Sequence, residues 1–328
     1  MGAVVVFAPS PVLTVTVEDV NGAADIHLHA GGQGVWQARM LTALGADVTM
    51  CAAFSGETGL VLQHLIADEG VRVLPVAGKG SSGAYLHDRR GGQRKVLAES
   101  PGHRLTRHEQ DELYGLTLQA GIEAGTVLLS GAGQEDPVPT DMYRRLTADL
   151  GAAGCTVIAD LTGERLTAVL AGRPAVIKMA DDEMVTSGRA TSAEIADLIR
   201  AMHTLARVGA SSVIVTRAHL PSLLLNEGEV CEVQIPELQT VDTSGAGDSL
   251  TAGIAAVLAK RGSLHDAVVL GTAAGAQNVT RHGLGTGEAT AIRQLSRLVR
   301  IVPLNDASGE GSVQQLSPDE LARKVRGS

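Results

Sequence analysis

Short runs of β-branched and other apolar residues alternate along most of the chain with longer stretches rich in Ala and Leu. Short apolar runs bounded by turn residues are typical of buried strands, and the Ala/Leu stretches have the length of helices that cover a sheet. The pattern therefore predicts βαβ units and a mostly parallel central sheet. Strands are predicted at 4–7, 47–53, 71–76, 126–130, 156–160, 175–178 and 212–216, and helices at 37–44, 108–120, 139–150, 165–170 and 192–208.

Two regions depart from this rhythm. In 12–20 with 25–30, and again in 83–88 with 94–98, the residues alternate as they do in exposed strands. The turn residues Arg89-Arg90-Gly91-Gly92 separate the second pair. The pattern predicts a small β-sheet lid, about 12–30 and 83–98, inserted in an α/β body.

After Asp248 the pattern is nearly all helical, with helices predicted at 250–260, 264–279 and 289–298. Residues 305–328 are polar and are expected to form an appended tail with one weak helix at 318–325. The predicted organisation is one domain over 1–304, with the lid inserted, followed by that tail.

Composition and charge narrow the class of protein. Only 2% of the residues are aromatic and 39 are glycine, so the core must be built from Ala, Val and Leu. The net charge of −9 leaves no basic surplus to neutralise nucleic-acid phosphates, which argues against a nucleic-acid partner. The three cysteines lack metal-ligand spacing. Because no signal peptide and no long apolar span are evident, we expect a cytoplasmic chain without a membrane partner.

The segment Asp242–Gly253, DTSGAGDSLTAG, carries the clearest chemical signal. A polar strand end is predicted to run into a turn of small residues and then into a helix. Gly245, Ala246 and Gly247 leave their N–H groups free to approach an anion at the positive end of that helix. Asp248 would repel the anion, unless its carboxylate accepts the proton of a hydroxyl that attacks a phosphoryl group. An ordinary capping aspartate is the alternative interpretation.

This segment resembles the C-terminal signature of the ribokinase/phosphofructokinase B (PfkB) family of carbohydrate kinases. Part of the N-terminal signature is matched by Ala30-Gly31-Gly32-Gln33-Gly34, Ala38-Arg39-Met40 and Leu44-Gly45-Ala46. Weaker similarities at 128–131, 158–160, 177–183, 213–216, 271–279 and 283–287 keep the family's order. The ending at 299–304 most resembles the branch that phosphorylates fructose 1-phosphate or tagatose 6-phosphate. The resemblance covers roughly residues 3–304.

The resemblance implies an α/β fold: a three-layer αβα sandwich of about nine strands in a mostly parallel sheet, with a β-sheet lid that pairs two chains in a homodimer. It implies transfer of the γ-phosphoryl of Mg-ATP to a hydroxyl of a sugar or sugar phosphate. Asp248 would be the general base, and Gly245, Ala246 and Gly247 the anion hole. The implied ATP-binding residues are Lys178, Thr216, Asp242, Thr243, Ser244, Asn278, Gly283 and Gly285.

The resemblance also implies metal sites. Glu183 would lie in the family's acidic motif and hold Mg²⁺ through water. Asp242, with the carbonyls of Asn278, Arg281 and Gly283, could hold a monovalent cation such as K⁺, as in some relatives.

The acceptor side departs from the family's pattern. Relatives usually carry an Asp after the first strand, but here the segment Pro9-Ser10-Pro11-Val12-Leu13 contains no acidic residue. Relatives also usually carry an Asn at the position of Trp36, which is the only tryptophan of this chain. Each lost partner for a hydroxyl costs about 1–3 kcal/mol. We therefore hypothesise an acceptor that is less hydroxylated, or that carries an aromatic or heterocyclic group stacked on Trp36. Plain packing beneath the lid is the alternative for Trp36.

The predicted acceptor contacts are Gly31, Gly32, Gln33, Gly34, Trp36, Arg39 and Arg90. A phosphorylated acceptor would need cations, and Arg39, Arg90 and Arg94 are the candidates. Solvated surface is the alternative for Arg90 and Arg94. Two other functions stay open: a nucleotide- or sugar-binding regulatory protein on a kinase scaffold, and a nucleoside kinase.

Overall fold

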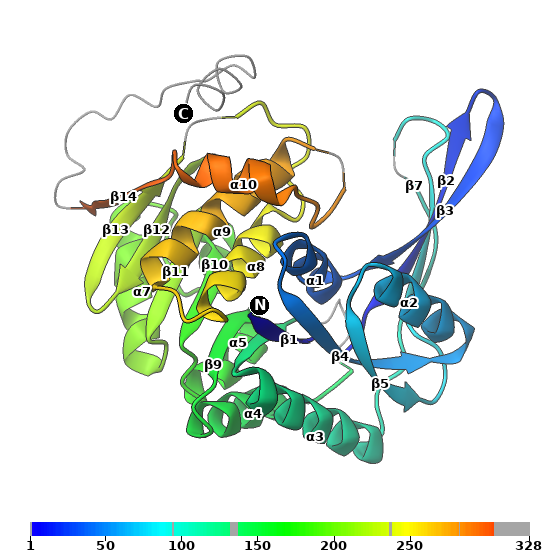
Figure 1. Ribbon diagram of the computed structural model, residues 1–328, viewed down its shortest axis with the longest axis horizontal. Coiled ribbons are helices and arrows are strands. Elements are labelled where there is room, and N and C mark those ends of the chain that lie inside the picture. Colours follow the sequence, from blue (N-terminus) through cyan, green and yellow to red (C-terminus); the bar gives the residue numbers. More distant parts are fainter. Residues whose placement is uncertain (1, 94, 132–136, 236–237, 282, 305–328) are drawn as a thin grey trace.

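A sheet of ten strands, in the order β14-β13-β12-β11-β10-β9-β8-β1-β4-β5, runs through the body (Figure 1). The computed structural model describes all residues except 1, 94, 132–136, 236–237, 282 and 305–328, so Arg94 and the predicted tail lie outside the described residues. From β5 to β11 in this order the strands are parallel, and β12, β13 and β14 continue antiparallel. The strands are β1 Ala3–Phe7, β4 Asp47–Ser55, β5 Arg72–Gly78, β8 Thr126–Ser130, β9 Thr156–Asp160, β10 Val176–Ala180, β11 Ser212–Arg217, β12 Leu220–Asn226, β13 Glu229–Gln234 and β14 Arg300–Pro303.

Helices cover both faces of this sheet, because successive strand residues point to opposite sides and both sides are apolar. One face, with Leu128 and Ile158, packs against α1 (Gln33–Ala43), α2 (Gly56–Asp68), α8 (Ala246–Leu258), α9 (Leu264–Val279) and α10 (Ala289–Ser296). The other, with Leu129 and Ala159, packs against α3 (Arg107–Ala124), α4 (Thr140–Ala152), α5 (Gly163–Ala171), α6 (Asp181–Thr186) and α7 (Ile195–Val208). The predicted αβα sandwich is confirmed.

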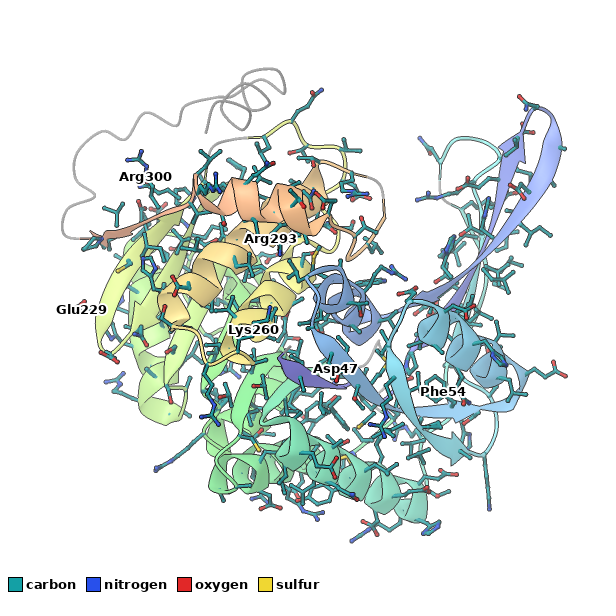
Figure 2. All side chains as sticks on the ribbon, in the orientation of Figure 1. Asp47, Phe54, Glu229, Lys260, Arg293 and Arg300 are labelled. Carbon is teal, nitrogen blue, oxygen red and sulfur yellow. The ribbon has the colours of Figure 1, made fainter. Side chains whose placement is uncertain are left out.

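The lid is a separate sheet in the order β3-β2-β6-β7, which stands away from the body (Figure 1). Its strands are β2 Val12–Val20, β3 Ala23–Gly31, β6 Ala84–Asp88 and β7 Lys95–Ser100. Val15 pairs with Leu28 and Val17 with Ile26, so one face is apolar. Thr14 pairs with His29 and Thr16 with His27 on the opposite, polar face. Figure 2 shows side chains projecting from both sides of the lid. Leu28 and Ile26, on the apolar face, are 43% and 60% exposed.

The structure corrects several predicted elements. Residues 238–245 do not form a strand before α8; the N–H groups of Val241 and Asp242 instead donate to the carbonyl of Val279. The first helix begins at Gln33 rather than at 37. Helix α2 was not predicted because Gly56 and Gly59 lower helix propensity. A Cβ on Gly59 would lie 2.9 Å from the carbonyl carbon of Phe54, so close packing requires that glycine.

Candidate active site

Three neighbouring parallel strands at the centre of the sheet carry polar residues at or near their carboxyl ends. Ser130 of β8 is the register partner of Asp160 of β9, and Asp160 is the partner of Lys178 of β10. All three lie two residues after apolar residues that face α1 and α8, so they point to the same side. Their exposures are 0%, 3% and 7%. Because buried polar groups are stable only with partners, this edge of the sheet requires polar side chains from the helices above it.

Asp160 is at the centre of the resulting network. Its Oδ1 lies 3.2 Å from Lys178 Nζ, and its Oδ2 accepts hydrogen bonds from Thr251 Oγ1 at 2.8 Å and from Gln37 Nε2 at 3.3 Å. Gln37 Oε1 accepts a hydrogen bond from Ser130 Oγ. Helices α1 and α8 thus supply the side chains that bind the polar strand ends.

Asp248, the third residue of α8, adds a second carboxylate to this network. Gln37 Nε2 lies 3.3 Å from its Oδ1. The pKa of Asp248 is raised to about 7, mainly by burial and then by the charge of Asp160, while Lys178 and hydrogen bonds from Gln33 and Gln37 act in the opposite direction. A carboxylate with a pKa near 7 can accept a proton effectively near neutral pH.

The positive charge of Lys178 partly compensates the negative charges of Asp160 and Asp248. Burial alone lowers its pKa, but the charges of Asp160, Asp248 and Glu183 outweigh burial, and the net shift of the Lys178 pKa is upward. The ammonium group therefore stays charged. A Cβ on Gly247 would lie 2.5 Å from Lys178 Nζ, so a glycine is needed for the lysine to reach the first turn of α8.

The turn before Asp248, which was predicted to hold an anion, begins α8 without a side-chain cap. Gly245 is the N-cap of α8, with a left-handed φ of 77° and no side-chain cap. The carboxylate of Asp248 bonds Gln37, which does not support the capping interpretation. The N–H of Ala246 makes a long bond of 3.3 Å to the carbonyl of Thr243, which an anion must compete with. The N-terminus of α8 and the ammonium group of Lys178 therefore lie close together, which is an arrangement that favours a bound anion.

The residues predicted for the nucleotide side fall into two groups. Asp242 Oδ1 accepts the N–H of Ser244 at 2.9 Å, and Asn278 Nδ2 donates to the carbonyl of Ser244 at 2.7 Å. A Cβ on Gly245 would lie 3.2 Å from the nitrogen of Gly285. These residues therefore gather beside the turn. Thr216 lies at the end of β11, where its hydroxyl is 3.4 Å from the carbonyl of Met179.

The side-chain oxygen of Asn278 is buried beside the predicted cation residues. The residue is 1% exposed, and its Oδ1 has no hydrogen-bond partner among the residues that the structure describes. Two of the three predicted cation carbonyls each accept one hydrogen bond: Asn278 O accepts the N–H of Arg281 at 3.3 Å, and Gly283 O accepts Thr286 Oγ1 at 3.0 Å. Glu183 Oε2 accepts the N–H of Ala180 at 2.8 Å in the first turn of α6.

The predicted acceptor residues other than Arg90 lie where β3 meets α1. Gly31 ends β3, Gly32 has a φ of 104°, and a Cβ on Gly34 would collide with Ala8. Gln33 Oε1 accepts the N–H of Gly131 at 2.7 Å, and its side chain also bonds Asp248. Gln33 thus belongs to the network around the carboxylates.

Trp36 is half-buried at the base of the lid, where its indole Nε1 would lie 3.9 Å from a Cβ on Gly31. The two described cations of the acceptor side are paired with carboxylates. Arg39 bonds Glu69, and exposed Arg90 makes bonds of 3.0 and 2.8 Å to Asp88 at the end of the lid hairpin. Neither guanidinium is held ready for a phosphate.

Four residues of the network were not predicted as site residues from the sequence: Ser130, Asp160, Gln37 and Thr251. Asp160 ends the apolar strand Thr156–Asp160, and a charged residue directly after buried positions was the available signal. Gln37 and Thr251 lie inside helices, where each looks like an ordinary polar residue.

Comparison with known proteins assigns the chain to a family. The sequence model of the pfkB family carbohydrate kinase matches residues 6–291. The chain belongs to this family. The ATP-dependent 6-phosphofructokinase isozyme 2 of Escherichia coli (strain K12) is 28% identical over 258 residues, which cover 77% of this chain and 82% of the relative. The 1-phosphofructokinase of Bacillus subtilis (strain 168) is 23% identical, covering 88% of this chain and 93% of the relative.

Solved structures of the family share the fold. Phosphofructokinase-2 from Escherichia coli in complex with potassium has a TM-score of 0.79 at 24% identity, covering 90% of this chain and 99% of that chain. The Arabidopsis thaliana ribokinase complexed with ribose and ATP has a TM-score of 0.68 at 20% identity, covering 90% and 99%. The ribokinase-like fold is therefore confirmed for this carbohydrate kinase family member. None of its described helices is long and apolar enough to cross a membrane.

Proposed function

We propose that the chain transfers the γ-phosphoryl group of ATP to a hydroxyl of a sugar or sugar phosphate, with Asp248 as general base and the Gly245-Ala246-Gly247 turn as anion hole. The observation that carries this proposal is the position of a proton-accepting carboxylate directly beside a left-handed glycine turn at a helix N-terminus. The names of the relatives support an ATP-dependent sugar-phosphate kinase.

In this mechanism the acceptor hydroxyl gives its proton to Asp248 as its oxygen attacks the γ-phosphorus. A bond forms between that oxygen and phosphorus, and the bond from phosphorus to the β–γ bridging oxygen breaks, so ADP leaves. The N–H groups of the turn stabilise the negative charge on the transferred group. Lys178, whose ammonium group lies next to Gly247, adds positive charge beside the transferred group.

The residues fit the cations that the family implies. Magnesium, when bound, would neutralise the phosphates of ATP. Glu183, whose charge helps to raise the pKa of Lys178, would hold this ion through water. Asp242 and the unpartnered Oδ1 of Asn278 suit a monovalent cation such as K⁺. The potassium complex of phosphofructokinase-2 supports this assignment.

The acceptor is proposed to lie between Gln33 and Trp36, where the lid joins the body. Names of relatives support fructose 6-phosphate or fructose 1-phosphate. Trp36 in place of the family's usual Asn favours a less hydroxylated acceptor, or a nucleoside whose base stacks on the indole. The pairing of Arg39 and Arg90 with carboxylates also favours an acceptor without a tightly held phosphate.

ADP release from Mg-ATP, measured across sugars, sugar phosphates and nucleosides, tests the proposal. The Asp248→Asn variant is expected to lose roughly 10²–10⁴-fold in kcat. Asp266→Asn, an exposed acid in the first turn of α9, is the matched control and should keep the wild-type rate. If ATP binds but no acceptor is turned over, the regulatory alternative replaces the kinase.

We also propose that two chains pair through their lids. The exposed apolar residues Ile26 and Leu28 support this proposal, because an apolar sheet face beyond the reach of α2 is stabilised by a partner. The tetrameric inhibited form of phosphofructokinase-2 is an assembled relative.

A further inference from the structure

Arg39 connects segments that lie far apart in the sequence. Its Nε and Nη2 donate to the two carboxylate oxygens of Glu69 at 2.8 and 2.5 Å. Its Nη1 donates to the carbonyl of Leu284 at 2.6 Å, and Nη2 also reaches the carbonyl of Ala30 at 3.2 Å. The side chains of Arg39 and Glu69 are 22% and 25% exposed, so water screens this bidentate pair only in part. The guanidinium group is thus held in one orientation by Glu69 while it bonds two carbonyls.

Each of these carbonyls belongs to a different side of the candidate active site. Ala30 precedes Gly31 at the end of β3, where the lid joins α1. Leu284 precedes Gly285, whose nitrogen would lie 3.2 Å from a Cβ on Gly245 in the proposed anion hole. The α-carbon of Leu284 would lie 3.4 Å from that same Cβ. Arg39 therefore bonds the root of the lid and a segment that packs against the anion-hole turn.

Little space separates that segment from Trp36. A Cβ on Gly285 would overlap the backbone carbonyl of Trp36, so the loop and the first helix are in direct contact. Residues 284–285 therefore contact the anion-hole turn, Trp36 and Arg39 at once, so a shift of this segment alters its packing against all three.

We propose that Arg39 is a positioning residue that couples the root of the lid to the anion-hole turn through Leu284. The inference rests on the proposed function, since it requires nucleotide phosphates at the turn. An anion bound there orders residues 284–285, which fixes Arg39 and, through the carbonyl of Ala30, the end of β3. A lysine cannot take this role, because its single ammonium group cannot span Glu69 and both carbonyls.

Amide hydrogen exchange of the full chain, with and without a saturating magnesium complex of a non-hydrolysable ATP analogue, tests this coupling. The chains compared are the wild type, Arg39→Lys, Arg39→Gln and the control Arg107→Gln, which removes an exposed pair with Asp111 on α3. Binding of the analogue is measured separately in each chain by the fluorescence of Trp36, the only tryptophan.

In the wild type and in Arg107→Gln, the analogue is expected to slow exchange at 28–31 by roughly fivefold or more. In both Arg39 variants, at saturating analogue, this slowing is expected to be lost. A merely structural role would lower stability but leave the nucleotide-dependent slowing in place, and that result in Arg39→Lys would overturn the inference.

The outcomes separate the inference from the proposed function. If the wild type binds the analogue without slower exchange at 28–31, the coupling is wrong and the kinase proposal stands. If the wild type does not bind the analogue, the kinase proposal fails and the coupling fails with it. Should Arg39→Gln not fold, the comparison of wild type with Arg39→Lys still decides.

Discussion

Asp248 lies in a place where burial, and then the nearby charge of Asp160, raise its pKa from 3.8 to about 7. Because the folded-state pKa exceeds the unfolded one, ionised Asp248 lowers the free energy of unfolding above pH 7, and this effect fades as the pH falls toward 4. We predict that Asp248→Asn raises the free energy of unfolding by roughly 2–4 kcal/mol at pH 8, and by much less near pH 4. Urea unfolding at both pH values checks this, and equal stability at pH 8 would contradict it.

Asp160 offers a second prediction, for activity. Its negative charge is a cause of the raised pKa of Asp248, so Asp160→Asn should lower that pKa and move the acidic limb of kcat/KM to lower pH. The pH profile is measured with the acceptor that the panel identifies. Thr251→Val removes a hydrogen bond to Asp160 but keeps its charge, and should leave the limb in place. A limb that stays fixed in Asp160→Asn would show that Asp160 does not tune the base.

At the scale of residues, the sequence predicts those parts of the candidate site whose residues are adjacent in the chain. Gly245, Ala246, Gly247 and Asp248 follow one another, so one segment of the sequence is enough to propose a joint role for them. Asp160, Gln37 and Thr251 come from β9, α1 and α8, and only the register of the strands and the packing of the helices bring them together. The pairing of Arg39 with Glu69 was hidden for the same reason, because α1 and the end of α2 meet only in the folded chain.

At the scale of elements, the contact between α1 and the loop before α10 is testable. Gly285 has a φ of 67°, and a Cβ there would overlap the Trp36 carbonyl, whereas Gly228 has a φ of 85° with open space around it. Gly228→Ala should therefore cost only the left-handed strain, about 1–2 kcal/mol. Gly285→Ala should cost more and also weaken nucleotide binding, because the clash displaces the loop beside Gly245. Denaturant unfolding and analogue titration check both, and equal losses would contradict the contact.

The helices and strands that could be predicted are those whose pattern of apolar residues matches the surface that they bury in the fold. Strands β8 and β9 lie at their predicted bounds, because buried parallel strands are apolar along their whole length. The hairpin of β12 and β13 was missed, since Pro221 and the polar residues of Glu229–Gln234 suit an edge of the sheet rather than its centre. Helix α2 depends on close contact at Gly59, which no propensity reveals.

At the scale of the whole molecule, the lid is a sheet with two unlike faces. Its apolar face is covered near the body, where Leu13 and Ala30 join the main core, and α2 contributes Leu62 and Ile66 to the same cluster. Farther out, Ile26 and Leu28 on this face are exposed, although a small sheet needs a packed face to be stable. A monomer would leave that part of the lid unsupported, which is the physical reason to expect a second copy.

We therefore predict that Ile26→Asp combined with Leu28→Asp converts a dimer into a monomer, because the charges must be desolvated when two lids pack together. Sedimentation equilibrium is expected to give twice the chain mass for the wild type and the chain mass for the variant. Ile122→Asp, at an apolar residue of α3 that is 50% exposed, is the control and should remain dimeric. A wild type that is monomeric at tens of micromolar, or a lid variant that stays dimeric, would contradict pairing through this face. If the variant is monomeric and loses activity with Asp248 and Lys178 intact, pairing also orders the lid for the acceptor.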